Sequence, residues 1–168
     1  MTPSEEWQIA DGTSADAAAL VALDARNFAR GDRFSSRLWR TILGQAASGK
    51  MLTIVARHQD AVFGAIVGEF HARVGKLTVW SIAVDGVARG SGLAQLLMAE
   101  LVRRTPAAYT RVGLDARRDN LRARRFYQRL GFRQEREIPR AYADGTAAIR
   151  YDMRVDDLRQ ALRLHTPQ

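Results

Sequence analysis

Two kinds of periodic pattern divide the chain into elements. Short runs rich in β-branched and aromatic residues, bounded by turn residues, are typical of strands, whereas apolar residues three and four positions apart are typical of one helix face. The first pattern predicts strands over residues 7–11, 51–58, 61–72, 76–84, 109–116, 132–138 and 146–155. The second predicts helices over residues 13–28, 35–47, 93–105, 120–131 and 156–165.

The order of these elements predicts their arrangement. Three strands between residues 51 and 84 follow one another closely, with Gln59 and Asp60 as a hairpin turn, and therefore form an antiparallel meander. A helix then separates the third strand from strand 109–116, which indicates one central strand–helix–strand crossover. At 168 residues and 46% apolar content, the chain is long enough for one domain with its own core. We therefore predict a single α+β domain over residues 1–168.

Individual residues support the helix predictions. The helix over residues 120–131 has Asn120 as its N-cap and Gly131 at its end. The preceding helix has leucines at the i, i+3, i+4 and i+8 spacing of a face that packs on a core. These leucines are Leu93, Leu96, Leu97 and Leu101.

The chain is strongly basic, with a formal charge of +8. Of its 26 basic residues only Lys50 and Lys76 are lysine, and the arginine fork suits phosphate and carboxylate groups. The charge favours anionic partners, namely a phosphorylated cofactor, acidic peptides or nucleic acid. A solvated, arginine-rich surface explains many of these residues equally well.

Several functions are excluded or disfavoured. The chain contains no cysteine, so disulfides, thiolate metal sites and a covalent acyl-cysteine intermediate are excluded. His58, His71 and His165 share no ligand spacing, and we predict no metal site. Residues 1–12 carry acids where a signal peptide needs a basic and an apolar segment, and the apolar stretch 17–23 is far shorter than the roughly 20 residues that span a bilayer. We expect a soluble, cytoplasmic protein.

The glycine stretch at residues 84–101, "VDGVARGSGLAQLLMAEL", joins a predicted strand to a predicted helix. A P-loop is excluded because no Gly-Lys-Ser/Thr ending is present, and a dinucleotide-binding fingerprint because Gln95 stands where its third glycine belongs. The first amides of a helix lack intrahelical partners and bind anions, and Gly90 and Gly92 let a diphosphate approach the backbone. Taken alone, the stretch fits a phosphate site and a plain helix entry equally well.

Further motifs follow in a fixed order. A strand ends in Ile-Ala-Val-Asp at residues 82–85, an Arg-Gly-x-Gly turn spans 89–92, and Asn-x6-Tyr-x3-Gly-Phe spans 120–132. Together they resemble the GNAT superfamily of acyl-CoA-dependent N-acetyltransferases. Segments 114–120 (LDARRDN) and 141–153 (AYADGTAAIRYDM) are similar to the ribosomal-protein alanine N-acetyltransferase type. The resemblance implies a mixed, mostly antiparallel central sheet of about seven strands flanked by helices.

The resemblance also implies an acetyl-CoA site. A bulge would splay strand 80–84 from strand 110–115, freeing backbone groups for the pantetheine arm and the developing oxyanion, and the loop at 89–94 would hold the diphosphate. The cofactor-binding residues so implied are Ile82, Ala83, Val84, Arg89, Gly90, Ser91, Gly92, Leu93, Ala94, Asn120, Arg122 and Tyr127. Val87 stands where the family often has Gln or Arg, so one cofactor contact is missing from the pattern.

Two residues are candidates for proton transfer. Tyr127 would protonate the departing thiolate, and Asp115 would accept the amine proton directly or through a water. Asp115 stands where the alanine-acetyltransferase type has Glu, and its side chain is shorter by one bond, about 1.5 Å. Core packing is the alternative for Tyr127. A solvated strand end, or an ion pair with Arg117, is the alternative for Asp115.

The acceptor is expected to be a primary amine. Tyr142 and Asp144 would form part of its binding wall, or else simply a hairpin turn with Gly145. Ala141 replaces the first tyrosine of the usual pair. An α-amine is more easily deprotonated than a lysine, so a modest base such as Asp115 favours a protein or peptide N-terminus.

Three functions therefore stay open at this point. The first is an acetyl-CoA-dependent N-acetyltransferase that acts by direct transfer. The second is a non-catalytic domain of the same fold that binds CoA or a polyanion, since a fold does not fix a function. The third is acetylation of a small-molecule amine, to which a basic protein is poorly matched if the amine is a polycation. Membrane and nucleic-acid partners are not expected.

Overall fold

The computed structural model describes residues 7–164 and divides them into two compact units. The first unit comprises residues 7–69 and 80–101, and the second comprises residues 70–79 and 102–164. The prediction of one domain over residues 1–168 stays a prediction.

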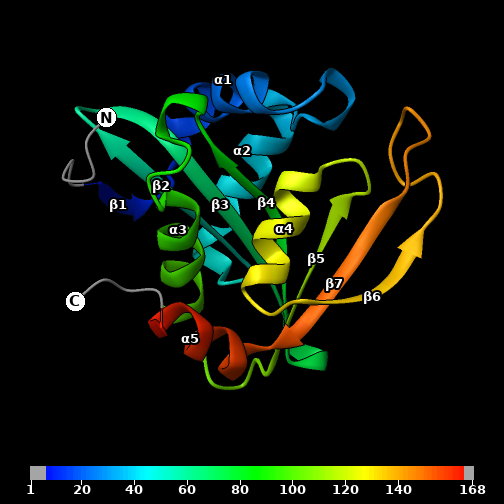
Figure 1. Ribbon diagram of the computed structural model, residues 1–168. Helices are drawn as coiled ribbons and strands as arrows, with labels where there is room; N and C mark the ends of the chain where they lie inside the picture. Colours follow the sequence, from blue (N-terminus) through cyan, green and yellow to red (C-terminus); the bar gives the residue numbers. More distant parts are fainter. Residues whose placement is uncertain (1–6, 165–168) are drawn as a thin grey trace. The chain divides into compact units, whose positions relative to one another are not determined.

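The predicted elements are present (Figure 1). The strands are β1 (Gln8–Asp11), β2 (Met51–His58), β3 (Ala61–His71), β4 (Lys76–Val84), β5 (Arg111–Arg117), β6 (Arg133–Ile138) and β7 (Ala148–Arg154). The helices are α1 (Ala17–Asn27), α2 (Ser36–Gly44), α3 (Leu93–Arg103), α4 (Leu121–Arg129) and α5 (Val155–Leu164). The strand order is β1-β2-β3-β4-β5-β7-β6. β4 and β5 are parallel and joined through α3, whereas β1/β2, β2/β3, β5/β7 and β6/β7 are antiparallel, which confirms the α+β fold class.

In the first unit, α1 and α2 pack on β2 and β3. Leu20 and Leu23 of α1 and Trp39 of α2 are buried in one hydrophobic cluster with Val55 and Val67. On the other side, Leu93 and Leu97 of α3 lie so close to Gly64 that a Cβ added there would stand 3.0 to 3.1 Å from them. The glycine therefore lets α3 approach the sheet closely.

Two details of the helix predictions were wrong. Leu96 is 41% exposed, whereas Leu93, Leu97 and Leu101 are buried together with Met98 and Val102. With roughly 100° between successive helical residues, the buried arc is centred between Leu97 and Met98 and leaves Leu96 outside it. The second helix ends as an α-helix at Gly44 instead of residue 47, because a separate 3₁₀ turn (Ala46–Ser48) follows it.

In the second unit, α4 and α5 cover one face of the sheet. Val112, Leu114 and Tyr151 are buried on that face, and the ring of Tyr127 from α4 lies 6.0 Å from that of Tyr151. Successive strand residues point to opposite faces, so the alternate residues of β5 and β7 form the other face. That face carries Asp115, the predicted base.

No helix in the part of the chain that the structure describes is long and apolar enough to cross a membrane.

Candidate functional site

The second half of β4 departs from a regular strand. Trp80 donates a hydrogen bond to Glu69 at 2.9 Å, and its ring lies 6.2 Å from that of Phe34. Phe34 packs on the same cluster that contains Ala83. Trp80 and Ala83 thus reach the same side of β4, although residues three apart in a regular strand point to opposite sides. The alternation is broken between them, which supports the bulge implied by the sequence.

The pairing of β4 with β5 ends just before this irregularity. The parallel register joins residues 76–79 to residues 111–114 and stops at Val79 and Leu114. Ile82 and Val84, which the sequence assigns to the pantetheine arm, are half-buried, and Ala83 between them is buried.

The glycine loop after β4 is open to solvent. Gly90 and Gly92 have φ angles of 81° and 83°, a conformation that favours glycine, and both are exposed with Ser91. A Cβ added at Gly90 would meet no atom within 4 Å, and one added at Gly92 would meet only the Gln95 side chain, at 4.0 Å. The backbone of this loop is therefore accessible to a ligand.

Amide groups with no acceptor inside the helix follow directly. The amide of Leu96 bonds to the Gly92 carbonyl at 3.0 Å and opens the α-helical ladder of α3. The amides of Leu93, Ala94 and Gln95 precede that bond and have no acceptor in the helix. The positive end of the helix dipole adds to them, so the start of α3 is suited to an anion.

Contacts with α1 hold the loop on its other side. Asp85 accepts from Arg26 Nε at 2.6 Å and from the Val87 amide at 3.2 Å. Burial raises the pKa of Asp85, but these hydrogen bonds and the charges of Arg26 and Arg89 outweigh burial and hold that pKa below its ordinary value. Arg89 also donates to Asn27 at 2.9 Å, so its guanidinium lies against the end of α1.

In the second unit, α4 begins and ends as its sequence predicts. Asn120 accepts from the Ala123 amide at 3.1 Å and caps the helix, and Gly131 follows it with a φ of 95°. Arg122, in the first turn, is exposed.

Tyr127 is almost fully buried on the inner face of α4. Its ring contacts the rings of Phe126, Phe132 and Tyr151 at centroid distances of 5.5, 5.9 and 6.0 Å. Burial, and then the neighbouring Tyr142 and Tyr151, raise the pKa of Tyr127 well above its ordinary value. A tyrosine phenol is protonated at neutral pH, and the raised pKa keeps Tyr127 in that form.

Asp115 lies in the fork of Arg150, its direct cross-strand neighbour on β7. Arg150 Nε and Nη2 each donate to one carboxylate oxygen at 2.8 Å. The same contacts raise the pKa of Arg150. The pairing of Asp115 with Arg117, weighed from sequence, was wrong because Arg117 lies two positions along β5 and bonds elsewhere. No sequence signal marked Arg150, since its contact depends on the register of distant strands.

Arg117 instead organises the loop that carries Tyr142 and Asp144. It donates to Asp144 and to Thr146 Oγ1, the latter at 2.9 Å, and its guanidinium lies 4.8 Å from the centre of the Tyr142 ring. The hydrogen bond from Arg117, together with those from Thr146, lowers the pKa of Asp144 to about 2. Gly145, with a φ of 85°, completes the turn. The hairpin turn is thus confirmed, while the role of Tyr142 and Asp144 in substrate binding stays a prediction.

The two histidines within the described residues lie on β2 and β3, and neither is among the predicted site residues. His58 contacts the rings of Trp7 and Phe63, and His71 ends β3. His165 lies outside the described residues. Within residues 7–164 no three His, Asp or Glu side chains form a group that could hold a metal ion.

Comparison with known proteins assigns a family to this arrangement. A model of the acetyltransferase (GNAT) family matches residues 17–132, which include the glycine loop and Tyr127. The chain belongs to the GNAT acetyltransferase family. The family membership expected from the sequence motifs is confirmed.

Proteins similar to this GNAT chain come from several organisms. An uncharacterised N-acetyltransferase of Methanocaldococcus jannaschii is 34% identical over 97 residues, 56% of this chain and 61% of that protein. The chain thus spans less than two thirds of that relative's length. The ribosomal-protein-S18-alanine N-acetyltransferase of Escherichia coli superposes with a TM-score of 0.77 at 19% identity, over 89% of this chain and 94% of that one. Ard1 of Thermoplasma volcanium superposes with a TM-score of 0.78 at 21% identity, over 88% of this chain and 97% of that one.

The predicted site residues of this GNAT chain fall into two groups. The first unit brings together those of β4 and the glycine loop, namely Ile82, Ala83, Val84, Arg89, Gly90, Ser91, Gly92, Leu93 and Ala94. The second unit holds Asp115, Asn120, Arg122, Tyr127, Tyr142 and Asp144. Within it, Arg117 joins Tyr142 to Asp144, while Asp115 pairs with Arg150.

Proposed function

We propose that this protein transfers an acetyl group from acetyl-CoA to a primary amine, the α-amine of a protein or peptide N-terminus, in the cytoplasm. The observation that carries the proposal is the open glycine loop with the acceptor-free amides of Leu93 and Ala94 behind it. Since the chain has no cysteine to carry the acetyl group, the amine attacks acetyl-CoA directly in a ternary complex.

The cofactor is bound mainly by main-chain groups. The diphosphate is held by the backbone of residues 89–94, where a pyrophosphate can approach without meeting a Cβ at Gly90 or Gly92. The pantetheine arm follows the irregular half of β4, where Ile82 and Val84 supply backbone hydrogen bonds. A backbone N–H freed by the bulge faces the oxyanion of the tetrahedral intermediate. Asn120 and Arg122 contact the cofactor from the start of α4.

The transfer has balanced proton steps. The amine nitrogen forms a bond to the thioester carbon, and Asp115 takes a proton from that nitrogen, directly or through a water. The carbon–sulfur bond then breaks, and Tyr127 donates its proton to the departing thiolate. Arg150 fixes the position of the Asp115 carboxylate through two hydrogen bonds. Tyr142 and Asp144 form part of the acceptor wall.

The test of the proposed function is the release of free CoA from acetyl-CoA. The acceptor panel contains peptides with free N-termini, peptides with blocked N-termini and one lysine, and small amines. The proposal expects release with free N-termini and mass spectrometry showing the acetyl group on the α-nitrogen. If acetyl-CoA binds but none of these acceptors gives release, the chain is a non-catalytic CoA-binding domain.

Substitution of Gly90 by Val is expected to weaken acetyl-CoA binding about tenfold or more. A β-branched side chain both disfavours the left-handed backbone, at a cost of roughly 1–2 kcal/mol, and occupies the open space over the loop. Isothermal titration gives the dissociation constant. Gly145→Val, at the same kind of backbone position in another loop, is the matched control and should leave acetyl-CoA affinity unchanged. Equal losses in both variants would contradict the placement of the diphosphate.

Substitution of Asp144 by Asn is expected to raise the acceptor KM by about two- to fivefold and to leave the acetyl-CoA KM unchanged, since an exposed ion pair contributes little. The change weakens the contact through which Arg117 holds Tyr142. The lowered pKa makes this contact stabilising above the ordinary value of 3.8, and the contribution is lost as pH falls through about 2. The effect of the variant should therefore be constant from pH 6 to 9. An effect on acetyl-CoA alone would contradict the assignment.

A further inference from the structure

The open face of the sheet in the second unit carries a group of charged side chains in cross-strand rows. The registers place Lys76, Arg111 and Arg154 in one row, Asp152 and Arg133 in the next, and Asp115, Arg150 and Arg136 in the third. We call these eight residues the charged face. It lies opposite the apolar face that packs on α4, and cations outnumber carboxylates on it.

Several like charges on this face are direct neighbours. Arg111 stands opposite both Lys76 and Arg154, and Arg150 stands opposite Arg136. Like charges directly opposite one another destabilise a sheet, so this arrangement needs anions to offset it. Such a local cost is typical of a functional surface.

The two carboxylates of the face offset only part of this charge. Asp152 binds both Arg111 and Lys76, the latter at 3.3 Å, and Asp115 binds Arg150. Lys76 reaches Asp152 by crossing Gly113, where a Cβ would stand 2.8 Å from the lysine Cε. Both carboxylates are thus already engaged.

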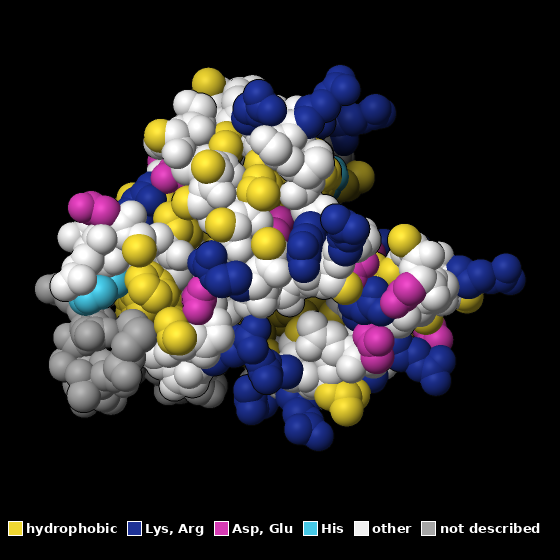
Figure 2. Space-filling view, turned by 90° about the horizontal axis from the view of Figure 1, so that it is seen from above, with side chains coloured by type: hydrophobic (Ala, Val, Ile, Leu, Met, Phe, Trp, Pro, Cys, Tyr) yellow, Lys and Arg dark blue, Asp and Glu magenta, His cyan; other side chains and the backbone are white. Residues whose placement is uncertain are grey.

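Three arginines of the charged face are available to bind an anionic ligand. Among residues 7–164, no carboxylate forms an ion pair with Arg133, Arg136 or Arg154, and all three are exposed. Lys and Arg side chains also gather in groups on the face of the molecule shown in Figure 2, where Asp and Glu side chains are fewer.

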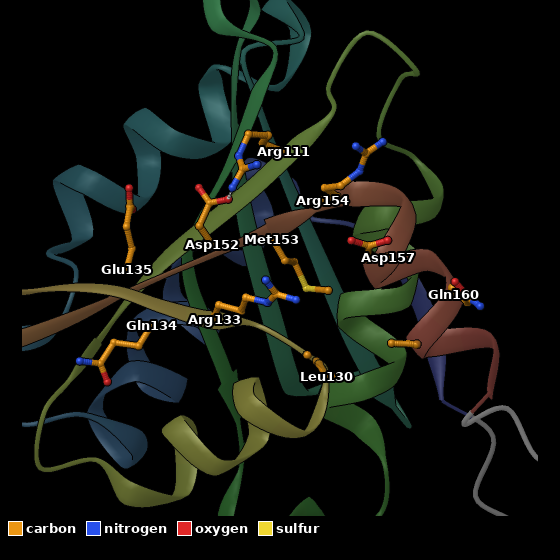
Figure 3. A pocket seen from close by; sticks show the side chains of 12 residues that line it. Arg111, Leu130, Arg133, Gln134, Glu135, Asp152, Met153, Arg154, Asp157 and Gln160 are labelled. Carbon is orange, nitrogen blue, oxygen red and sulfur yellow. Dashed lines mark hydrogen bonds and ion pairs between the residues drawn. The ribbon is translucent and has the colours of Figure 1, made fainter.

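A pocket of about 730 Å³ lies at the end of the charged face farthest from Asp115. Arg111, Arg133, Asp152 and Arg154 line it, with Met153 and Leu130 as apolar neighbours and Glu135 and Asp157 as further acids. Figure 3 shows the Arg133 side chain extending into this pocket and Arg111 bonded to Asp152. The charged face thus extends from Asp115, the proposed base, to the pocket into which the Arg133 side chain points.

We propose that the charged face binds the segment that follows the acceptor amine and selects acidic residues in it. This inference rests on the proposed function, because it takes Asp115 as the place of the amine. Along β5 the row of Asp152 lies about 7 Å and the row of Arg111 about 13 Å from Asp115, at roughly 3.3 Å per strand residue. An extended peptide has the same rise, so the preferred acidic residues are those at about positions 3 and 5.

The observations favour a peptide over a nucleic acid. Single-stranded nucleic acids bind on cationic grooves with aromatic side chains on which the bases stack. The rows of the charged face contain no aromatic residue and interleave carboxylates with arginines. Arginines fixed on strands match single carboxylates through paired hydrogen bonds.

The test compares the binding of two labelled octapeptides in the presence of CoA by fluorescence anisotropy. They differ only in carrying Glu or Gln at positions 3 and 5. The Glu peptide is expected to bind about tenfold more tightly at low salt, and the preference should shrink as salt rises. The double variant Arg133→Gln, Arg154→Gln, which removes one arginine from each of the two rows that face these positions, is expected to lose the preference. The control double variant Arg129→Gln, Arg163→Gln removes the same charge from exposed positions in α4 and α5 and should retain it.

Equal binding of the two peptides to the wild-type protein would overturn the inference. So would a preference that survives in the Arg133, Arg154 variant, or one that the control variant loses to the same extent. A further contrary result is an RNA oligonucleotide that binds more tightly than the Glu peptide, displaces it, and depends on Arg133 and Arg154. CoA release is measured on the same peptides. Equal CoA release with the Glu and Gln peptides would refute this inference but not the proposed function. If no acceptor gave CoA release, the proposed function itself would be refuted.

Discussion

Replacing Tyr127 by Phe is expected to lower kcat by about 100-fold or more, the usual contribution of a positioned general acid. The phenol is protonated at neutral pH, and burial raises its pKa further. The variant removes this proton while keeping the ring that packs against Phe126, Phe132 and Tyr151. The measurement is steady-state CoA release, with acetyl-CoA affinity determined separately by titration.

The control for this variant separates chemistry from packing. Phe126→Leu alters a neighbouring ring contact without removing a hydroxyl, and it should change kcat by less than about tenfold. The melting temperature of the Tyr127→Phe variant should stay close to that of the wild-type protein. A Tyr127→Phe enzyme with unchanged kcat, or one that loses acetyl-CoA binding instead, would assign Tyr127 to core packing.

Peptides with a free α-amine are expected to react on the order of 100-fold faster at pH 7.5 than otherwise equal peptides whose only amine is a lysine, because reference pKa values of about 7.8 and 10.4 leave very different neutral fractions. Both oxygens of Asp115 already accept hydrogen bonds from Arg150. The reaction therefore depends on amine that is already neutral. The measurement is kcat/KM for the two peptide classes.

The pH profile adds an independent check on the acceptor. Between pH 6 and 7.5 the rate with α-amine peptides should rise as their own amine loses its proton. Rates with lysine peptides should still be rising at pH 9. Faster reaction of lysine at pH 7.5 would mean that a stronger base than Asp115 acts, and would contradict the preference for N-termini.

Much of the fold follows from local signals. The hairpin turn shows this at the level of single residues, since Gln59 and Asp60 both adopt positive φ angles between β2 and β3. Asn120 and Gly131 bound α4 because capping and left-handed turns are decided by the residue itself. The face of α3 was predicted less well. Leucine spacing alone does not tell which side of a leucine-rich helix meets the sheet, and Leu96 is exposed.

The partners of the site residues could not be predicted in the same way. Asp115 and Arg150 are 35 positions apart, and only the register of β5 and β7 makes them neighbours. The contacts of Arg117 with Asp144 and Tyr142 depend on the same register. The glycine loop, in contrast, could be predicted from sequence, because its open backbone follows from Gly90 and Gly92 themselves. Sequence thus indicated the open backbone of the glycine loop, but it did not indicate the partners of Asp115 and Arg117.

The most direct measurement is the change in backbone amide NMR signals when CoA is added, compared with pantetheine, which lacks the diphosphate. If the start of α3 binds the diphosphate, CoA should shift the amide signals of Gly90, Gly92, Leu93 and Ala94 strongly, and pantetheine should leave them nearly unchanged. The signals of residues 133–135, which line the pocket at the end of the charged face, should not respond to either. If saturating CoA left the signals of residues 90–94 unchanged, the result would contradict the proposed acetyl-transfer site.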